Sequence, residues 1–131
     1  MTNIPEDLRY TSDHEWVRDL GKGRVAVGLT EFATRQLGDI VFLELPAVGD
    51  RLEASEAFGS VESVKAVAEV YAPVTGEVTA ANTAVVEDPE LCNTDPYGDG
   101  WLVEIAADDP GHADTLMSAV DYRAYCEAEE G

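Results

Sequence analysis

The chain has 131 residues, and its 27 aspartates and glutamates against 8 lysines and arginines give a formal net charge of −19. Nucleic-acid binding is not expected, because phosphate contacts need a basic face, and an anionic membrane surface would repel the chain. No stretch approaches the roughly 18 consecutive apolar residues of a membrane-spanning helix. The acidity favours solubility and docking onto basic patches of partner proteins, although a high-salt habitat would produce the same composition.

The N-terminal sequence and the cysteines predict a cytoplasmic protein without a metal centre. The N-terminus is acidic and has no basic stretch followed by an apolar run, so neither a secretory signal nor a transit peptide is expected. Cys92 and Cys126 are the only cysteines, which is too few for a disulfide scaffold. The two histidines, His14 and His112, lack the spacing of metal ligands, so we expect no bound metal.

The first informative segment ends in a tryptophan. His14 and Glu15 directly precede Trp16, and they can be interpreted as a catalytic pair or as the polar edge beside a buried core anchor. A hydrolase or isomerase built on this pair is not favoured, because no serine or cysteine stands in a recognisable nucleophile motif. The second interpretation is therefore preferred.

The next segments predict a strand, a short helix and a second strand. Residues 24–29 alternate as a strand behind a glycine turn. Thr30 can provide the N-cap of a short helix over residues 31–37, which Gly38 ends. Residues 39–45 are rich in β-branched and aromatic side chains and predict another strand.

Lys65 lies at the centre of the most informative stretch, residues 58–78, and is one of only two lysines in the chain. The apolar positions change parity at this lysine, from odd numbers before it to even numbers after it: Gly59 and Val61, then Val64, Ala66, Ala68 and Val70. Because strand side chains alternate between faces, this change predicts two strands joined by a tight turn over residues 63–66. Lys65 would then be held out at the tip, although a solvent-facing lysine on an ordinary edge strand is the alternative.

The remaining sheet segments are short. Residues 51–53, 77–82 and 101–105 are expected to be strands. Residues 83–87 are expected to be irregular, and residues 88–100 form a long loop rich in proline and glycine.

The C-terminal tail is expected to form two helical pieces, over residues 113–119 and 122–128. Their apolar side chains would pack back on the sheet: Leu116, Val120, Tyr122 and Tyr125. Many short strands, frequent turn signals and few helices indicate a mainly β protein, a sandwich or a barrel. No long linker divides the chain, so residues 1–131 are expected to form a single domain.

The sequence around Lys65 resembles a known family. Gly49 and Gly76 flank the lysine at a spacing similar to that of lipoyl domains, which biotin carriers share. A biotin carrier would normally have methionine on each side of its lysine, whereas Val64 and Ala66 stand here. The longer phrases resemble the H proteins of the glycine cleavage system, at residues 14–17, 37–42, 44–46, 59–66, 70–78, 93, 95–97 and 100–102. The resemblance extends from about Leu8 to Glu127, nearly the whole chain.

This resemblance implies a cofactor carrier rather than an enzyme. The family fold is a barrel-sandwich hybrid, a flattened β-barrel with short flanking helices that include one at the C-terminus. A lipoyl group would be joined by an amide to the ε-amine of Lys65. It would carry an aminomethyl group from the pyridoxal-phosphate-dependent glycine decarboxylase (P protein) to the tetrahydrofolate-dependent aminomethyltransferase (T protein). Dihydrolipoyl dehydrogenase (L protein) would reoxidise it, and a lipoate ligase or a lipoyl/octanoyl transferase would attach it.

The resemblance also implies a cleft that shelters the loaded arm, lined by Asp13, Glu15, Gln36 and Glu69. Carboxylates there would hold the amine as an ammonium, because a nearby opposite charge favours the charged form. The sequence departs from some family members at two of these positions, since Gln36 replaces a histidine and Asp13 replaces a serine. Alternatively, all four are ordinary polar side chains in contact with solvent, which are common in so acidic a chain.

Two other functions remain open from the sequence. Some H proteins act as lipoyl donors or relays that supply 2-oxoacid dehydrogenases, and the residues of this chain are compatible with that role. An interaction module without a cofactor is the other alternative. The modification state of Lys65 distinguishes a carrier from such a module.

Overall fold

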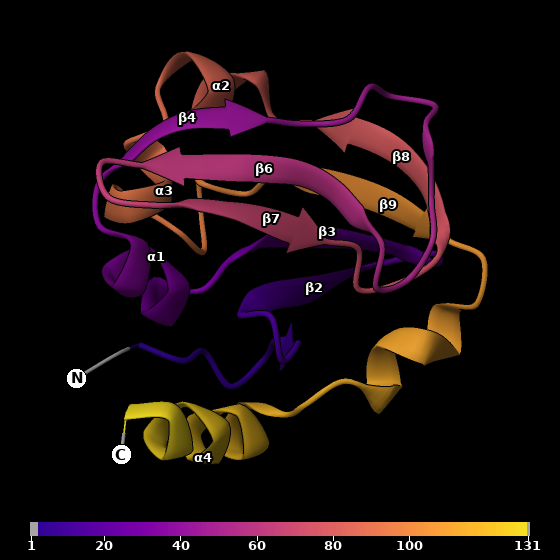
Figure 1. Ribbon diagram of the computed structural model, residues 1–131. Coiled ribbons are helices and arrows are strands. Elements are labelled where there is room, and N and C mark those ends of the chain that lie inside the picture. The colour runs from indigo at the N-terminus through magenta and orange to yellow at the C-terminus, as the bar shows by residue number, and fades with distance from the viewer. Residues whose placement is uncertain (1–2, 131) are drawn as a thin grey trace.

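The computed structural model describes residues 3–130, with side chains described through residue 129, and shows two antiparallel sheets that face each other (Figure 1). The larger sheet has six strands, in the spatial order β1 (Arg9–Tyr10), β2 (Glu15–Gly21), β3 (Arg24–Leu29), β9 (Val103–Ala107), β8 (Gly76–Ala81) and β5 (Arg51–Leu52). The smaller sheet has three strands, in the order β4 (Ile40–Glu44), β6 (Ala57–Ser63) and β7 (Val67–Tyr71). Within the described residues the two remain separate ladders and do not close into one ring. The mainly β, sandwich-like architecture agrees with the predicted fold class.

The space between the sheets is filled by aliphatic side chains from both of them. Val27 and Ile105 point inward from the larger sheet, and Val61 and Val70 point inward from the smaller one. Each is 1% exposed or less. Because side chains alternate along a strand, burial of Val61 and Val70 turns their neighbours Glu62 and Glu69 toward solvent. The alternation therefore fixes which face of the lysine hairpin is open to partners.

A second apolar cluster lies between the larger sheet and the C-terminal helix α4 (Ala119–Glu130). Its largest side chains are Tyr10, Trp16 and Tyr122, all fully buried. Trp16 pairs with Gly28 across β2 and β3, where a Cβ atom would lie 2.6 Å from the indole ring. Glycine is therefore required opposite the tryptophan, and the interpretation of Trp16 as a core anchor is confirmed.

The predicted first helix is confirmed as α1 (Glu31–Leu37). The Thr30 side chain accepts a hydrogen bond from the Ala33 backbone N–H, which satisfies a donor of the first turn. Gly38 ends the helix with φ of +82°, a left-handed conformation that glycine adopts at little cost. The predicted strands at residues 24–29 and 39–45 are likewise present as β3 and β4.

Two segments expected to be irregular contain short helices. Residues 83–87 form α2 (Thr83–Glu87), and the predicted loop over residues 88–100 contains α3 (Leu91–Thr94). The reason for α2 is the Asn82 side chain, which accepts from the Ala84 N–H and donates to the backbone oxygens of Asp99 and Trp101. These contacts anchor the helix start to the following loop, which local sequence does not reveal.

The last strand lies later than predicted, because β9 begins at Val103 and not at residue 101. Trp101 belongs to the second apolar cluster and not to the sheet. The Leu102 backbone N–H donates to the Val27 oxygen before regular pairing begins. Trp101 therefore packs in the second cluster, and the strand begins two residues later than predicted.

The tail forms two helical elements with bounds that differ from the prediction. The first is the 3₁₀ helix η1 (Pro110–Thr115), and the second is α4, which begins at Ala119. Tyr122 packs into the second cluster as expected, but the prediction for Val120 is wrong, since this side chain is 77% exposed. Starting at residue 119 places Ala119, Tyr122 and Cys126 on one face of the helix and Val120 on another. No helix within residues 3–130 has the length and hydropathy of a membrane span.

Candidate functional site

Lys65 lies exposed at the tip of the hairpin formed by β6 and β7. The strands end at Ser63 and begin again at Val67, so the predicted turn is confirmed. The Ser63 backbone N–H donates to the Ala66 oxygen at 2.8 Å. The Ser63 hydroxyl accepts from the backbone N–H groups of Lys65 and Ala66, at 3.3 and 3.0 Å. One side chain thus satisfies the amides of the turn and stiffens the base from which the lysine extends.

The hairpin tip is also tied to the segment that follows α1. The Val64 backbone N–H donates to the Asp39 oxygen at 3.1 Å. Asn93, from α3, accepts from the Ile40 N–H at 2.9 Å and donates to the Gly38 oxygen at 3.0 Å. The amide of Asn93 therefore fixes both sides of residue 39, and residue 39 in turn holds the hairpin.

The stem of the Lys65 side chain passes over Gly38. A Cβ atom added to this glycine would lie 3.6 Å from the lysine Cε. Among the described residues, Lys65 forms no salt bridge. The amine is consequently accessible on a braced support, which suits a covalent modification.

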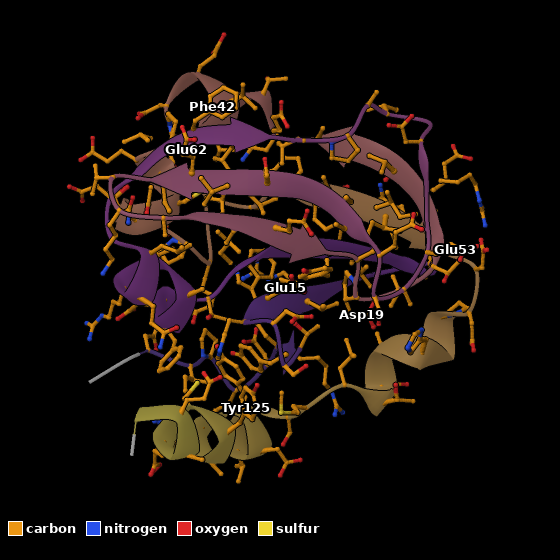
Figure 2. All side chains as sticks on the ribbon, in the orientation of Figure 1. Glu15, Asp19, Phe42, Glu53, Glu62 and Tyr125 are labelled. Atoms are coloured by element: carbon orange, nitrogen blue, oxygen red, sulfur yellow. The ribbon has the colours of Figure 1, made fainter. Side chains whose placement is uncertain are left out.

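Glu15, at the start of β2, is a buried carboxylate, only 1% exposed, that lies between the two sheets (Figure 2). Its Oε1 accepts from the Thr11 hydroxyl at 2.9 Å, and its Oε2 accepts from the Tyr71 backbone N–H at 2.8 Å. Burial raises the pKa of Glu15 to about 7, although both hydrogen bonds act in the opposite direction. Within the described residues no lysine, arginine or histidine forms an ion pair with it. The site therefore contains a buried acceptor without a cationic partner.

Of the other residues proposed for the cleft, two lie close to Glu15 or Tyr71 and one lies on α1. Asp13 and Glu15 both line a cavity of about 380 Å³, and the negative charge of Asp13 contributes to the raised pKa of Glu15. Glu69 is exposed and accepts a hydrogen bond from the Tyr71 hydroxyl at 3.3 Å. Gln36 is exposed on the last turn of α1, near Gly38, and its side chain makes no hydrogen bond among the described residues. Glu15 and Glu69 thus both form hydrogen bonds with Tyr71, and Asp13 lines the same cavity as Glu15, whereas Gln36 lies on α1, two residues before Gly38.

His14 points away from Glu15 and toward α4. Its Nδ1 lies 2.7 Å from the Tyr122 hydroxyl, and its Nε2 lies 2.7 Å from a Glu129 carboxylate oxygen. The Tyr122 hydroxyl also bonds Thr30 Oγ1 at 2.7 Å. The side chain of His14 therefore holds the C-terminal helix, which gives no support to a catalytic pair with Glu15.

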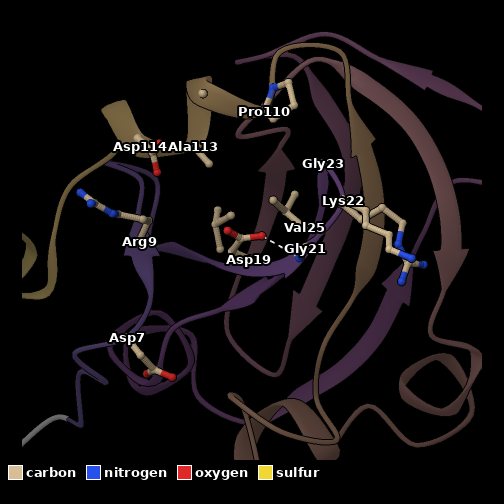
Figure 3. Close-up of a pocket in the computed structure, with 13 residues that line it drawn as sticks. Asp7, Arg9, Asp19, Gly21, Lys22, Gly23, Val25, Pro110, Ala113 and Asp114 are labelled. Carbon is tan, nitrogen blue, oxygen red and sulfur yellow. Dashed lines mark hydrogen bonds between the residues drawn. The ribbon is translucent and has the colours of Figure 1, made fainter.

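A separate cavity lies between the β2–β3 turn and η1 (Figure 3). Its volume is about 500 Å³, and neither Lys65 nor any of the proposed cleft residues lines it. Asp19 points into it and is held by a hydrogen bond from the Gly21 N–H. Over residues 3–130, the acidic, histidine and cysteine side chains form no group that could hold a metal ion.

Three residues of the site, Ser63, Thr11 and Tyr71, were not singled out as site residues from the sequence. Ser63 could have been recognised, because serine at the first position of a turn commonly accepts from the amides that follow. Thr11 and Tyr71 act through Glu15, and Tyr71 does so with its backbone. A backbone contact across 56 positions leaves no residue-type signal in the sequence.

Comparisons with known proteins agree with this geometry. The family model described as glycine cleavage H-protein matches residues 8–129. The glycine cleavage system H protein of Idiomarina loihiensis is 52% identical over 124 residues, which cover 95% of this chain and 96% of that protein. The protein of the same name from Halorhodospira halophila is 50% identical over 131 residues, and the match covers 100% of both chains.

A solved structure resembles the whole fold. The crystal structure of a glycine cleavage system H protein from Mycobacterium marinum superimposes with a TM-score of 0.85 at 39% sequence identity. The match covers 98% of this chain and 100% of that one. The family model, the two relatives and the solved structure all match this chain over nearly its full length. The chain therefore belongs to the glycine cleavage H-protein family.

Proposed function

We propose that Lys65 carries a lipoyl group, joined by an amide to its ε-amine, and that the protein presents this group to the enzymes of the glycine cleavage system. As a member of its family the chain is a carrier protein rather than an enzyme. The observation that supports the proposal best is the exposed amine at the tip of a braced hairpin, without a salt bridge among the described residues. A rigid base reduces the entropy lost when the arm docks.

A bound lipoyl group would supply a disulfide that accepts an aminomethyl group together with two electrons. The chain would meet in turn the glycine decarboxylase, the aminomethyltransferase and the dihydrolipoyl dehydrogenase, after a ligase or transferase has attached the group. The protein's own part in this cycle is to hold residue 65 at a fixed position in solvent. Ser63 and Asn93 do this by fixing the turn and its support.

We propose that Glu15, with Asp13 and Glu69 near it, shelters the amine of the cargo, and that Gln36 on α1 lines the path of the arm. A buried carboxylate whose hydrogen-bond donors are both neutral would be stabilised by an incoming ammonium, which would lower its pKa. Glu15 would in turn keep the amine protonated, and a protonated amine has no lone pair with which to expel sulfur. Asp13, which lines the same cavity, would add to the negative potential.

Replacing Lys65 with arginine tests the proposal, and Lys22→Arg, at the only other lysine, is the matched control. Arginine keeps the positive charge but is not an equivalent nucleophile, so Lys65→Arg should fold normally and accept no lipoyl group. Peptide mass spectrometry after incubation with a lipoate ligase should find the modification at Lys65 in the parent chain and in Lys22→Arg. Glycine decarboxylation should be lost only in Lys65→Arg. Full activity of Lys65→Arg, or an unmodified parent chain, would refute the assignment.

A further inference from the structure

A β-bulge in β4 turns two consecutive apolar side chains toward solvent. Ile40 pairs with Ser63 and Phe42 pairs with Glu62, so Val41 is an extra residue without a partner on β6. In a regular strand one of two neighbours would point inward, but Val41 and Phe42 are each 50% exposed. Bulges are frequent beside functional sites, where they redirect a side chain. This bulge lies on the strand that pairs with the lysine hairpin.

The exposed apolar side chains continue across the smaller sheet to the hairpin tip. Phe42 is opposite Glu62 (Figure 2). Glu62 is opposite Val67, so these three share one outer face. Val67 is 67% exposed, and Val64, next to the lysine, is 68% exposed. We call Val41, Phe42, Val64 and Val67 the hairpin patch. Single exposed apolar residues are ordinary, but a group beside a functional residue marks an interaction surface.

The surroundings of the hairpin patch are negative. Glu62 lies between Phe42 and Val67, and in the adjoining row Glu69 is opposite Ser60, which is opposite Glu44. The sequences of β4, β6 and β7 contain no lysine or arginine. Acylation would also remove the charge of Lys65. The surface therefore complements a partner that presents an apolar area rimmed by basic groups.

We propose that the hairpin patch, with Glu62 and Glu69, is the docking surface for the enzyme that acylates Lys65, which rests on the proposed function. In that step the deprotonated ε-amine attacks the carbonyl carbon of an acyl thioester or an acyl-nucleotide anhydride. The C–N bond forms as the bond to the thiol or phosphate breaks, and the amine gives up one proton. The reacting atoms must approach to about 3–3.5 Å before this occurs.

The length of the side chain identifies the acylating enzyme as the occupant. An unmodified lysine has only a four-carbon stem, so its amine reaches the active site only if the residues beside it contact the enzyme. A completed lipoyl arm is longer and can enter an active site while the hairpin stays farther from the enzyme surface. The step that uses the bare lysine is therefore the one that requires Val64 and Val67 to be covered.

Steady-state acylation of the full-length unmodified chain by a purified lipoate ligase tests this surface. Phe42→Ser and Val67→Thr remove exposed apolar groups, and Val67→Thr keeps a β-branched strand residue. Each should raise the KM for the carrier about fivefold or more, with little change in kcat, because central interface residues contribute about 1 kcal/mol or more. Val48→Thr, a matched change at an exposed valine in the β4–β5 connection, should leave both constants unchanged.

The contribution of the acidic side chains to docking is measured by the salt dependence of acylation. Glu62→Gln should make kcat/KM for acylation less sensitive to salt, because rim charges mainly accelerate encounter and are screened within about 10 Å at 0.1 M salt. Unchanged KM values in both Phe42→Ser and Val67→Thr would overturn the proposal. So would a loss seen only in glycine decarboxylation by fully lipoylated variants, since the occupant would then be another enzyme. A parent chain that the ligase does not modify would instead refute the proposed function.

Discussion

Burial of Glu15 links its protonation to the stability of the fold. Its pKa rises from an ordinary 4.5 to about 7, so the folded chain retains this proton over a pH range in which the unfolded chain has lost it. Because the folded state then binds more protons, the free energy of unfolding falls as the pH rises from about 4.5 to about 7. Above that range the destabilisation is complete and amounts to roughly 3 kcal/mol.

Glu15→Gln removes this dependence, because glutamine is neutral at every pH. The stability of the parent chain relative to the variant should fall by roughly 2 kcal/mol between pH 5 and pH 8. Urea unfolding at both pH values measures the difference, with the exposed carboxylate variant Glu53→Gln as control. Parallel pH profiles for the parent chain and Glu15→Gln would contradict the raised pKa.

The same variant tests the proposed shelter. A neutral amide cannot stabilise an ammonium as a carboxylate does, so Glu15→Gln should release ammonia faster from the loaded carrier in the absence of the aminomethyltransferase. Glu53→Gln should release it at the parent rate. An unchanged rate in Glu15→Gln would remove this residue from the shelter while leaving the role of Lys65 intact.

The role of Lys65 can be predicted from the sequence, whereas the burial of Glu15 cannot. The position of Lys65 at a turn tip can be predicted from the sequence. The apolar residues change from odd to even positions at this lysine, and this pattern depends only on the alternation of side chains along each strand. The polar edge expected beside Trp16 does not hold for Glu15, since Glu15, Trp16 and Val17 are buried in succession. The burial of Glu15 depends on the distant Tyr71 amide, a contact that arises only when the two sheets face each other.

Among the elements, the lysine hairpin depends on the short helix α3, which contains none of the residues proposed to hold the lipoyl group or its cargo. Asn93 in α3 satisfies the backbone of Gly38 and Ile40, and the Asp39 oxygen between them accepts from Val64. The support for the carrier lysine is thus a hydrogen-bond chain from α3 to β4 to the turn. This helix was missed in the sequence because a four-residue helix in a loop rich in proline and glycine has almost no periodic signal.

Asn93→Ala should loosen the hairpin tip without removing the lysine. The substitution leaves the Ile40 N–H without its acceptor, which should lower the free energy of unfolding by about 1–3 kcal/mol. Hydrogen exchange of the Val64 amide should accelerate by more than the global destabilisation explains. Thr94→Ala, an exposed position in the same helix, is the control and should leave that exchange unchanged. Unaltered protection of Val64 in Asn93→Ala would contradict the proposed brace.

Across the whole fold, the Tyr122 hydroxyl connects α4 to two distant segments of the chain. Tyr122 stacks on Tyr10 with ring centroids 4.5 Å apart, and its hydroxyl bonds both Thr30 and His14. Thr30 is also the N-cap of α1, so the first and last helices share a hydrogen-bond network. The sequence predicted that Tyr122 packs inward, but the network could not be predicted, because its members are separated by 92 and 108 positions.

Tyr122→Phe should destabilise the fold while keeping the ring in place. Loss of the buried hydroxyl removes its hydrogen bonds to Thr30 and His14, which should cost about 1–2 kcal/mol and lower the Tm by about 4–8 °C. Tyr125→Phe is the matched control, because the Tyr125 hydroxyl, which donates to the Ser12 backbone oxygen, lies at the surface and not in the buried cluster. Thermal unfolding followed by circular dichroism compares the two, and equal Tm shifts would argue against a special role for the Tyr122 hydroxyl.

The bulge at Val41 also bears on self-association. β4 is an outer strand of its sheet, and an unbroken outer strand with exposed apolar side chains is a template for pairing with another copy of the chain. An extra residue bends the strand and disturbs the spacing of its backbone groups. The bulge that exposes two apolar side chains to an enzyme therefore also disfavours edge-to-edge pairing of β4 with another copy of the chain.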